Sequence, residues 1–198
     1  MIYKNPNIPI IPNPVGLDAA VAELQHSVAG LEYIERAFGR AFVHKETRAG
    51  RLITLPKVYQ GEGEYYNPLP NGNFKGSVFF IAEGSEQCEE YNQFEQNVFT
   101  RKVGLIFWGN LKEIDPAKDY IFLEEIKMDI LEAIKYCKCF KSYDSYVDER
   151  YNEVFKEFSS YISNMSTDNA KEEINTQYLM YPYAGFRMSL TLTYNQPC

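Results

Sequence analysis

A regular spacing of apolar side chains predicts a helix near the start of the chain. From Leu17 to Phe38 apolar residues recur every three or four positions, and the residues between them are mostly polar. Asp18 is suited to cap the first turn and Gly39 to end the last one. The pattern predicts one amphipathic helix over 17–38, whose apolar stripe needs a sheet or a second helix to cover it.

A second helical pattern follows Asp115-Pro116. An acidic N-cap residue and a proline at the first helical position are typical of a helix start, and from there Leu123 and Ile130 share a face that continues to Cys137. Acidic residues dominate the first half and lysines the end, which suits the helix dipole. The sequence therefore predicts a second main helix that ends near Cys137.

Four further segments have the patterns of strands. Residues 51–60 alternate, and Pro56 marks an edge or a bulge because proline cannot donate to a ladder. Residues 77–82 and 97–111 contain nearly continuous apolar runs, and 77–82 is expected to be a central strand buried on both faces. The cleanest alternation covers 178–194. Its predicted core face holds Phe186, Met188, Leu190, Leu192 and Tyr194, and its predicted wet face holds Arg187, Ser189, Thr191 and Thr193.

The segments between these elements are less regular. Residues 1–16 contain closely spaced prolines, which predict an extended arm near polyproline II. This arm docks either on a neighbouring subunit or on its own domain, and the sequence leaves both open. The remainder, 17–198, is predicted to be a single domain with a long loop at 61–76, an acidic loop at 83–90 and a small helical insertion at 142–176.

Together these elements predict an α+β fold. About four mainly antiparallel strands form the sheet, the two main helices cover one face, and the other face stays exposed. Open sheet edges invite association, and closing the subunits into a ring would remove them. Tyrosine, present sixteen times, suits such protein–protein contacts. The candidate subunit-interface residues are Ile8, Ile10, Ile11, Pro12, Tyr65, Tyr66, Tyr181, Tyr183 and Arg187.

Composition narrows the functional classes. The chain has 198 residues with 20 Lys and Arg against 27 Asp and Glu, a formal net charge of −7, and this acid excess disfavours a simple polyanion-binding protein. No apolar run approaches the roughly 20 residues of a membrane span. The first residues lack the pattern of a signal peptide, so we expect the protein to remain where it is made.

Candidate catalytic and metal-binding chemistry is sparse. Cys137 and Cys139 form a lone Cys-x-Cys pair, whereas a zinc site needs four ligands, so we expect reduced thiols and neither a metal nor a cofactor. No phosphate-binding loop, serine elbow or metalloprotease motif is present. The best candidates for an enzyme are the carboxylates of 83–90, with His44 as a base.

One short stretch is locally basic in this acidic chain. Its simpler interpretation is a solvated connection between elements. The alternative is a contact with an acidic neighbour or with DNA phosphates. The candidate basic contact residues are Arg36, Arg40, Lys45, Arg48 and Arg51.

Three parts of the chain follow a familiar order: the opening helix from Leu17, the apolar strands 79–81 and 105–108, and a closing pair made of the helix 122–137 and the strand 186–194. This order resembles that of the tail-terminator and tail-completion proteins of tailed bacteriophages, small α+β subunits that form rings at the neck or tail. The heavy use of Asn, Tyr and Lys is similar to that of phages of Bacteroides-type hosts, crAss-like phages included.

The resemblance implies a structural virion protein without enzymatic activity, assembled in the host cytoplasm and placed in the tail or neck. It implies a homo-oligomeric ring of six or twelve copies that joins other neck, ring or tail-tube proteins around the DNA channel, without sequence-specific DNA binding and without a membrane. A channel lined by acids repels the DNA backbone and lets it slide during genome ejection. The alternatives left open are a small acidic cytoplasmic enzyme and a monomeric adaptor or nucleic-acid-binding module. The candidate lumen-facing acids are Glu62 and Glu64 in one loop and Glu83, Glu86, Glu89 and Glu90 in another.

Overall fold

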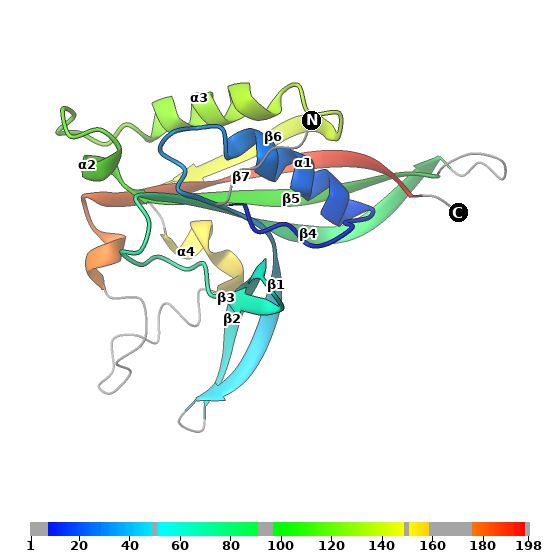
Figure 1. The fold of residues 1–198 in the computed structure, drawn as a ribbon, viewed down its shortest axis with the longest axis horizontal. Helices are drawn as coiled ribbons and strands as arrows, with labels where there is room; N and C mark the ends of the chain where they lie inside the picture. The colour runs from blue at the N-terminus through cyan, green and yellow to red at the C-terminus, as the bar shows by residue number, and fades with distance from the viewer. Residues whose placement is uncertain (1–7, 49–50, 91–96, 149–150, 159–175, 197–198) are drawn as a thin grey trace.

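One seven-stranded mixed sheet organises the fold (Figure 1). The computed structural model describes residues 8–48, 51–90, 97–148, 151–158 and 176–196. The strands lie in the order β3-β2-β1-β4-β5-β7-β6, and every neighbouring pair is antiparallel except β1 and β4, which run parallel. The strands are β1 (Arg36–Arg48), β2 (Arg51–Gly61), β3 (Glu64–Tyr66), β4 (Gly76–Glu90), β5 (Asn97–Asn110), β6 (Phe140–Asp148) and β7 (Tyr183–Gln196).

Two helices, α1 (Leu17–Val28) and α3 (Leu123–Ile134), cover one face of the sheet (Figure 1). Their apolar stripes pack on the side chains that β4, β5 and β7 direct toward them, and Leu24, Phe107 and Ile130 are fully buried in this core. The short helix α2 (Leu111–Ile114) follows β5 directly. We call this side the helix face of the sheet.

Shorter pieces cover the opposite face. They are α4 (Tyr151–Val154) and the 3₁₀ turns η1 (Lys156–Phe158) and η3 (Thr176–Leu179). Phe155 is fully buried there, with its ring centroid 5.3 Å from that of Trp108. The central strands are therefore buried on both faces, and we call this side the second face.

The β1–β2 hairpin extends beyond the body of the sheet (Figure 1). β1 pairs with β4 only as far as Ala41, whereas its pairing with β2 continues from Phe42 to Arg48. On the other side, β3 pairs only with Val58 and the residues after it. Within the described part of the chain, the outer half of the hairpin thus has no third strand. We call residues 42–57 the ribbon.

The predicted sheet of about four mainly antiparallel strands with one exposed face is wrong. The sheet has seven strands, one pair is parallel, and elements cover both faces. β1 was missed because its residues were assigned to a helix and a basic connection. β3 has only three residues inside the predicted 61–76 loop. β6 was missed because register shifts after Phe140 and after Tyr143 interrupt its two-residue alternation.

The predicted helix over 17–38 is too long. α1 ends at Val28, and β1 begins at Arg36. Ile34 and Phe38 keep a helical spacing, yet Ile34 lies in the core on the helix face and Phe38 in the core on the second face. The apolar stripe of one helix cannot contact both sides of a sheet. The three-and-four spacing therefore continues by coincidence beyond the end of α1, through the turn and into β1.

The predicted acidic loop over 83–90 is also wrong, because β4 continues through it. A register shift follows Glu83, and Gly84 adopts φ 60°, which lets the strand stay beside β5. The predicted helical insertion over 142–176 begins instead as the strand β6 and continues as α4 and η1. Its residues 159–175 lie outside the described residues.

The second main helix begins later than predicted. α3 starts at Leu123 and ends at Ile134. Asp115 follows α2 and accepts a hydrogen bond from the backbone N–H of Ala117 at 3.1 Å, which makes Asp115-Pro116 part of a turn. The proline signal therefore marked the end of one helix and not the start of the next.

Other strand predictions are confirmed. Residues 51–60, 77–82 and 97–111 correspond to β2, part of β4, and β5, and β4 is central as expected. The last strand, predicted over 178–194, is β7, which begins only at Tyr183 because Tyr178 and Leu179 belong to η3. Its predicted core face is buried on the helix face of the sheet. Its predicted wet face is wrong at Arg187, which is buried.

Gln25 fastens the described part of the N-terminal arm to the domain. Only 2% of this residue is exposed, and its Nε2 donates to the carbonyl oxygen of Pro9 at 3.0 Å and to that of Ala37 at 2.7 Å. Pro9 is itself buried. At this point the arm packs on its own domain, while residues 1–7 lie outside the described residues.

Replacing Gln25 by leucine should lower the free energy of unfolding by about 1–3 kcal/mol, because two buried carbonyl groups lose their donor. Urea unfolding followed by the fluorescence of Trp108 measures the change. Gln60→Leu, at an exposed position of β2, is the control and should change the stability by less than about 0.5 kcal/mol. Equal losses in the two variants would show that the Gln25 hydrogen bonds do not stabilise the domain.

Candidate functional site

A buried arginine lies on the second face of the sheet. Arg187 follows Phe186 and precedes Met188 in β7, and both of these neighbours point into the core on the helix face. Strand alternation therefore turns Arg187 to the opposite side, where only 3% of the residue is exposed. A guanidinium removed from water needs opposite charges and a full set of acceptors.

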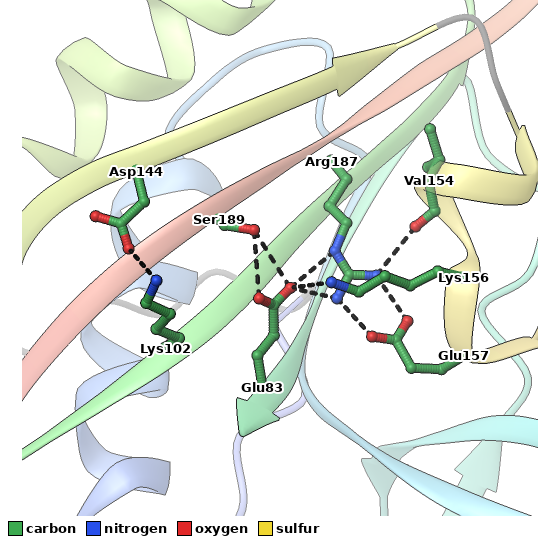
Figure 2. A network of polar contacts seen from close by, with 8 residues as sticks. All are labelled: Glu83, Lys102, Asp144, Val154, Lys156, Glu157, Arg187 and Ser189. Carbon is green, nitrogen blue, oxygen red and sulfur yellow. Dashed lines mark hydrogen bonds and ion pairs between the residues drawn. The ribbon is translucent and has the colours of Figure 1, made fainter. Parts of the chain in front are cut away.

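All five N–H donors of Arg187 are used (Figure 2). Nε donates to Glu83 Oε1 at 2.9 Å, and Nη2 donates to the same oxygen. Nη1 and Nη2 donate to the two oxygens of Glu157 at 2.6 and 2.7 Å, a bidentate pair. Nη1 also donates to the carbonyl oxygen of Val154 at 3.2 Å. Arg187 therefore has no donor left for an outside ligand.

The partners of Arg187 come from distant parts of the chain. Glu83 belongs to β4 and Glu157 to η1. Ser189 Oγ donates to both oxygens of Glu83 at 3.3 Å, and Lys156 Nζ lies 3.5 Å from Glu83 Oε1. One guanidinium thus ties two strands to the short elements on the second face. We call these five residues the charge cluster.

Gly104 in β5 leaves space for the charge cluster. It pairs with Ser189 of β7, and a Cβ at this position would lie 2.8 Å from Arg187 Nε and from Glu83 Oε1. These distances are too short for a carbon atom, so only glycine fits without moving the ion pair. The glycine inside this buried strand is explained by the close approach of two side chains.

Glu83 and Arg187 each have a pKa shift that favours the charged form. Burial raises the pKa of Glu83, but Arg187 and Lys156 outweigh this effect and hold the pKa below the ordinary value of 4.5. Burial likewise lowers the pKa of Arg187, and Glu157 and Glu83 more than compensate, so that pKa is raised. The cluster is suited to bracing the structure with fixed charges and not to transferring protons.

An open groove of about 550 Å³ lies beside the charge cluster. Glu83 and Lys156 line it together with Lys102 of β5 and Thr191 of β7. Lys102 Nζ lies 3.8 Å from Asp144 Oδ2 of β6 (Figure 2). The lining carries charges of both signs, with Glu83 and Glu89 against Arg101, Lys102 and Lys156, so the groove does not present a field of one sign.

The predicted interface residues differ in exposure. Tyr65 and Tyr181 are exposed, whereas Tyr66 stacks on Phe38 with ring centroids 5.3 Å apart and Tyr183 is partly buried. Tyr65 and Tyr181 are therefore accessible for a subunit contact. Of the remaining candidates, Ile8, Ile10 and Ile11 are partly buried, Pro12 is exposed, and Arg187 is buried in the charge cluster.

The predicted lumen-facing acids fall into two different settings. Glu62 and Glu64 are exposed at the turn between β2 and β3, and Glu62 there adopts φ 52°. The other set lies along β4 and contacts neighbouring strands. In that set Glu83 belongs to the charge cluster, Glu86 accepts a hydrogen bond from the Tyr194 hydroxyl, Glu89 pairs with Lys141, and the Glu90 side chain lies outside the described residues.

The predicted basic contact residues lie on strands and not in a connection. β1 carries most of them, and its outer part belongs to the ribbon. His44, the base considered for an enzyme, is also on the ribbon, and its Nε2 lies 3.8 Å from Glu46 Oε2. Arg36 lies over the Phe74 ring at 5.5 Å, Arg40 Nε lies 2.7 Å from Asp18 Oδ1, Lys45 is exposed, and the side chains of Arg48 and Arg51 lie outside the described residues.

The Cys-x-Cys pair is buried. Burial raises the pKa of both Cys137 and Cys139, and the Ser27 hydroxyl lies 3.0 Å from Cys137 Sγ. Cys88 is exposed, and Cys198 lies outside the described residues. Within the described ranges, no group of three or more His, Cys, Asp or Glu side chains is placed to hold a metal ion.

Three members of the charge cluster, Glu83, Arg187 and Ser189, were predicted in other roles, and Lys156 and Glu157 were not predicted at all. Glu157 and Lys156 lie in a short segment without a regular pattern, so nothing in the sequence indicated them. Two signals were present elsewhere: Gly104 interrupts an apolar strand, and Arg187 is the one cation in an otherwise uncharged alternating strand. An isolated glycine in a strand indicates a close approach of other groups.

No protein-family model matches the chain, and neither does any curated protein sequence. Among the described residues, no helix is long and apolar enough to cross a membrane. The family, the assembly and the place in a virion therefore stay predictions.

Arg187→Met should lower the free energy of unfolding by about 3–5 kcal/mol, because Glu83 and Glu157 would lose the guanidinium that neutralises them in a buried place. The control is Lys102→Met, which removes a cation whose side chain is 63% exposed and should cost less than about 1 kcal/mol. Urea unfolding measures both. A small and similar loss in the two variants would contradict the bracing role.

The low pKa of Glu83 also predicts a pH dependence. Its ionised form stabilises the fold fully above the ordinary carboxyl pKa of 4.5, and this contribution is lost as the pH falls below that value toward the folded pKa. Urea midpoints measured from about pH 7 to about pH 3 should fall more steeply for the wild type than for Glu83→Gln. Parallel profiles would show that Glu83 is not stabilised in its charged form.

Proposed function

We propose that this protein is a structural virion subunit that forms a homo-oligomeric ring at the head–tail junction or tail of a tailed bacteriophage, of the tail-terminator or tail-completion type. The ring joins neighbouring neck, ring or tail-tube proteins around the channel through which the genome is ejected. The observation that carries this proposal is the ribbon, a projecting element that leaves large apolar side chains uncovered.

The ribbon needs a partner for physical reasons. A two-stranded hairpin alone is marginally stable in water. Phe42, Val43 and Leu52 on the ribbon are 39%, 53% and 68% exposed. Burying these side chains against a partner would stabilise the contact by roughly 25 cal/mol for every Å² of apolar surface removed from water. A neighbouring subunit can supply the cover that the chain's own described residues do not.

The outer edge of the sheet supports the same conclusion. β6 is a nine-residue strand at the end of the strand order, paired only with β7 among the described strands. Its free backbone donors and acceptors form a template for another chain, and Tyr143 on it is 41% exposed. A closed ring is one arrangement that covers such an edge in every copy.

The segments that resemble the phage family are formed as elements of this fold. The opening helix is α1, the apolar runs 79–81 and 105–108 pair as antiparallel parts of β4 and β5, and the closing helix and strand are α3 and β7. This element order supports the proposal independently of the ribbon.

A channel for DNA needs surfaces that repel phosphate. Glu62 and Glu64 are the predicted acids that best suit this role, because both are exposed and neither has an ion-pair partner among the described residues. The acids on β4 are used by the charge cluster, by Tyr194 and by Lys141. We therefore assign the β2–β3 turn to the lumen.

The purified protein should behave as a ring of about 140 or 280 kDa, six or twelve times the 23.0 kDa of one chain. Size-exclusion chromatography with light scattering measures the mass, and negative-stain images show a central hole. A stable monomer at all concentrations would contradict the proposal. Salt-sensitive DNA binding by that monomer would then favour a nucleic-acid-binding module, and a monomer without it an enzyme or an adaptor.

A further inference from the structure

We infer that the ribbon of one copy docks on the α2–α3 surface of the next copy, in a head-to-tail contact. This inference rests on the proposed ring and names the two surfaces that form it. The donor surface is the described part of the ribbon, residues 42–48 and 51–57, and the acceptor surface is the outward side of residues 111–134.

One face of the ribbon is exposed toward its outer end, whereas Pro56 at the base of the same face is buried and Thr54 is partly buried. Val43, Lys45, Thr47 and Leu52 share this face, because Thr47 pairs with Leu52 in the ladder and alternate residues of a strand point to the same side. All four are exposed in the single chain. The face therefore presents two aliphatic side chains, one hydroxyl and one cation to a partner.

The ribbon and the rest of the chain carry opposite charges. Residues 42–57 hold four Lys and Arg and one Glu, a net charge of +3. The whole chain is −7, so the remaining residues carry −10. A second copy of this chain is thus a partner of complementary sign, and complementary potentials steer such contacts and fix their register.

The α2–α3 segment is an acceptor that matches the ribbon in its net charge and in its exposed apolar side chains. Residues 111–134 contain seven Asp and Glu against three Lys, a net charge of −4. Some of these acids pair with the lysines of the same surface, as Glu125 does with Lys118, and the net charge stays negative. Tyr120, Ile121 and Met128 are 54%, 50% and 59% exposed there. Both surfaces therefore combine exposed apolar side chains with charged neighbours, and their net charges have opposite signs.

The two surfaces lie on different sides of the molecule. α2 and α3 lie on one side of the sheet and the ribbon points away from the other side (Figure 1). A ribbon therefore cannot reach the α3 surface of its own chain. A contact between two different surfaces is heterologous, and repeated copies of it produce a ring when the rotation closes.

Cysteine cross-linking tests the contact. Cys88 and Cys198 are first replaced by serine, and Leu52→Cys and Met128→Cys are introduced together into that background. Mild oxidation should give a ladder of covalent dimers, trimers and larger species up to the closed ring. Non-reducing electrophoresis resolves the ladder, and light scattering before oxidation gives the assembly state.

Matched single variants define the geometry. Leu52→Cys alone and Met128→Cys alone should not cross-link, and a mixture of the two should give only the covalent dimer. Cross-linking of Leu52→Cys with itself would show a symmetric ribbon–ribbon contact and overturn the inference. Rings without any cross-link would overturn it too, while leaving the proposed ring intact. A cross-linked ladder from a protein that never closes into rings would support the contact and contradict the ring.

A charge exchange separates a protein partner from DNA. Lys45→Glu should weaken assembly about tenfold, since one attraction becomes a repulsion, and Glu125→Lys in the same chain should restore most of it. Salt-sensitive binding of duplex DNA that Lys45→Glu abolishes, with unchanged assembly, would assign the ribbon to DNA and overturn the inference.

Discussion

The fold depends on satisfying one buried guanidinium. Arg187 lies among apolar strands, where a bare charge would cost far more than a domain of this size can offset, so the chain must bring Glu83 and Glu157 to it. This requirement explains why β4 continues past its apolar run, why β5 has a glycine at Gly104, and why short elements without a strong pattern of their own hold a fixed place on the second face.

The spacing of apolar residues was sufficient to locate a helix or strand where that spacing stays within a single element. It located α1 at its start, α3 in its middle, β4 and β5 by their apolar runs, and the core face of β7. It failed where a regular spacing crossed from one element into another, as between Ile34 and Phe38, which lie in different cores. It failed again in β6, where register shifts destroy the alternation.

The candidate sites were predictable only in part. Tyr65, Tyr181 and the acids of the β2–β3 turn are exposed as expected, whereas Tyr66 and Tyr183 are partly buried. The charge cluster was not predictable as a unit, because Glu83 lies 104 residues and Glu157 lies 30 residues from Arg187. Gly104 and Arg187 stand out in the sequence, but neither indicates which acids the arginine pairs with. The ribbon was hidden for a different reason: its basic side chains resemble a solvated connection, and its apolar residues Phe42, Val43 and Leu52 are exposed in the single chain, so no buried stripe marks it as a strand.

The place of β7 in the strand order has a kinetic consequence. β7 lies between β5 and β6, and both precede it along the chain. Before β7 docks, β6 has no neighbour in the sheet and one edge of β5 is open along its apolar run. Pairing between such distant segments is slow, and an open apolar edge can recruit another unfinished chain. The molecule is therefore most vulnerable to aggregation in the interval just before its last strand is inserted.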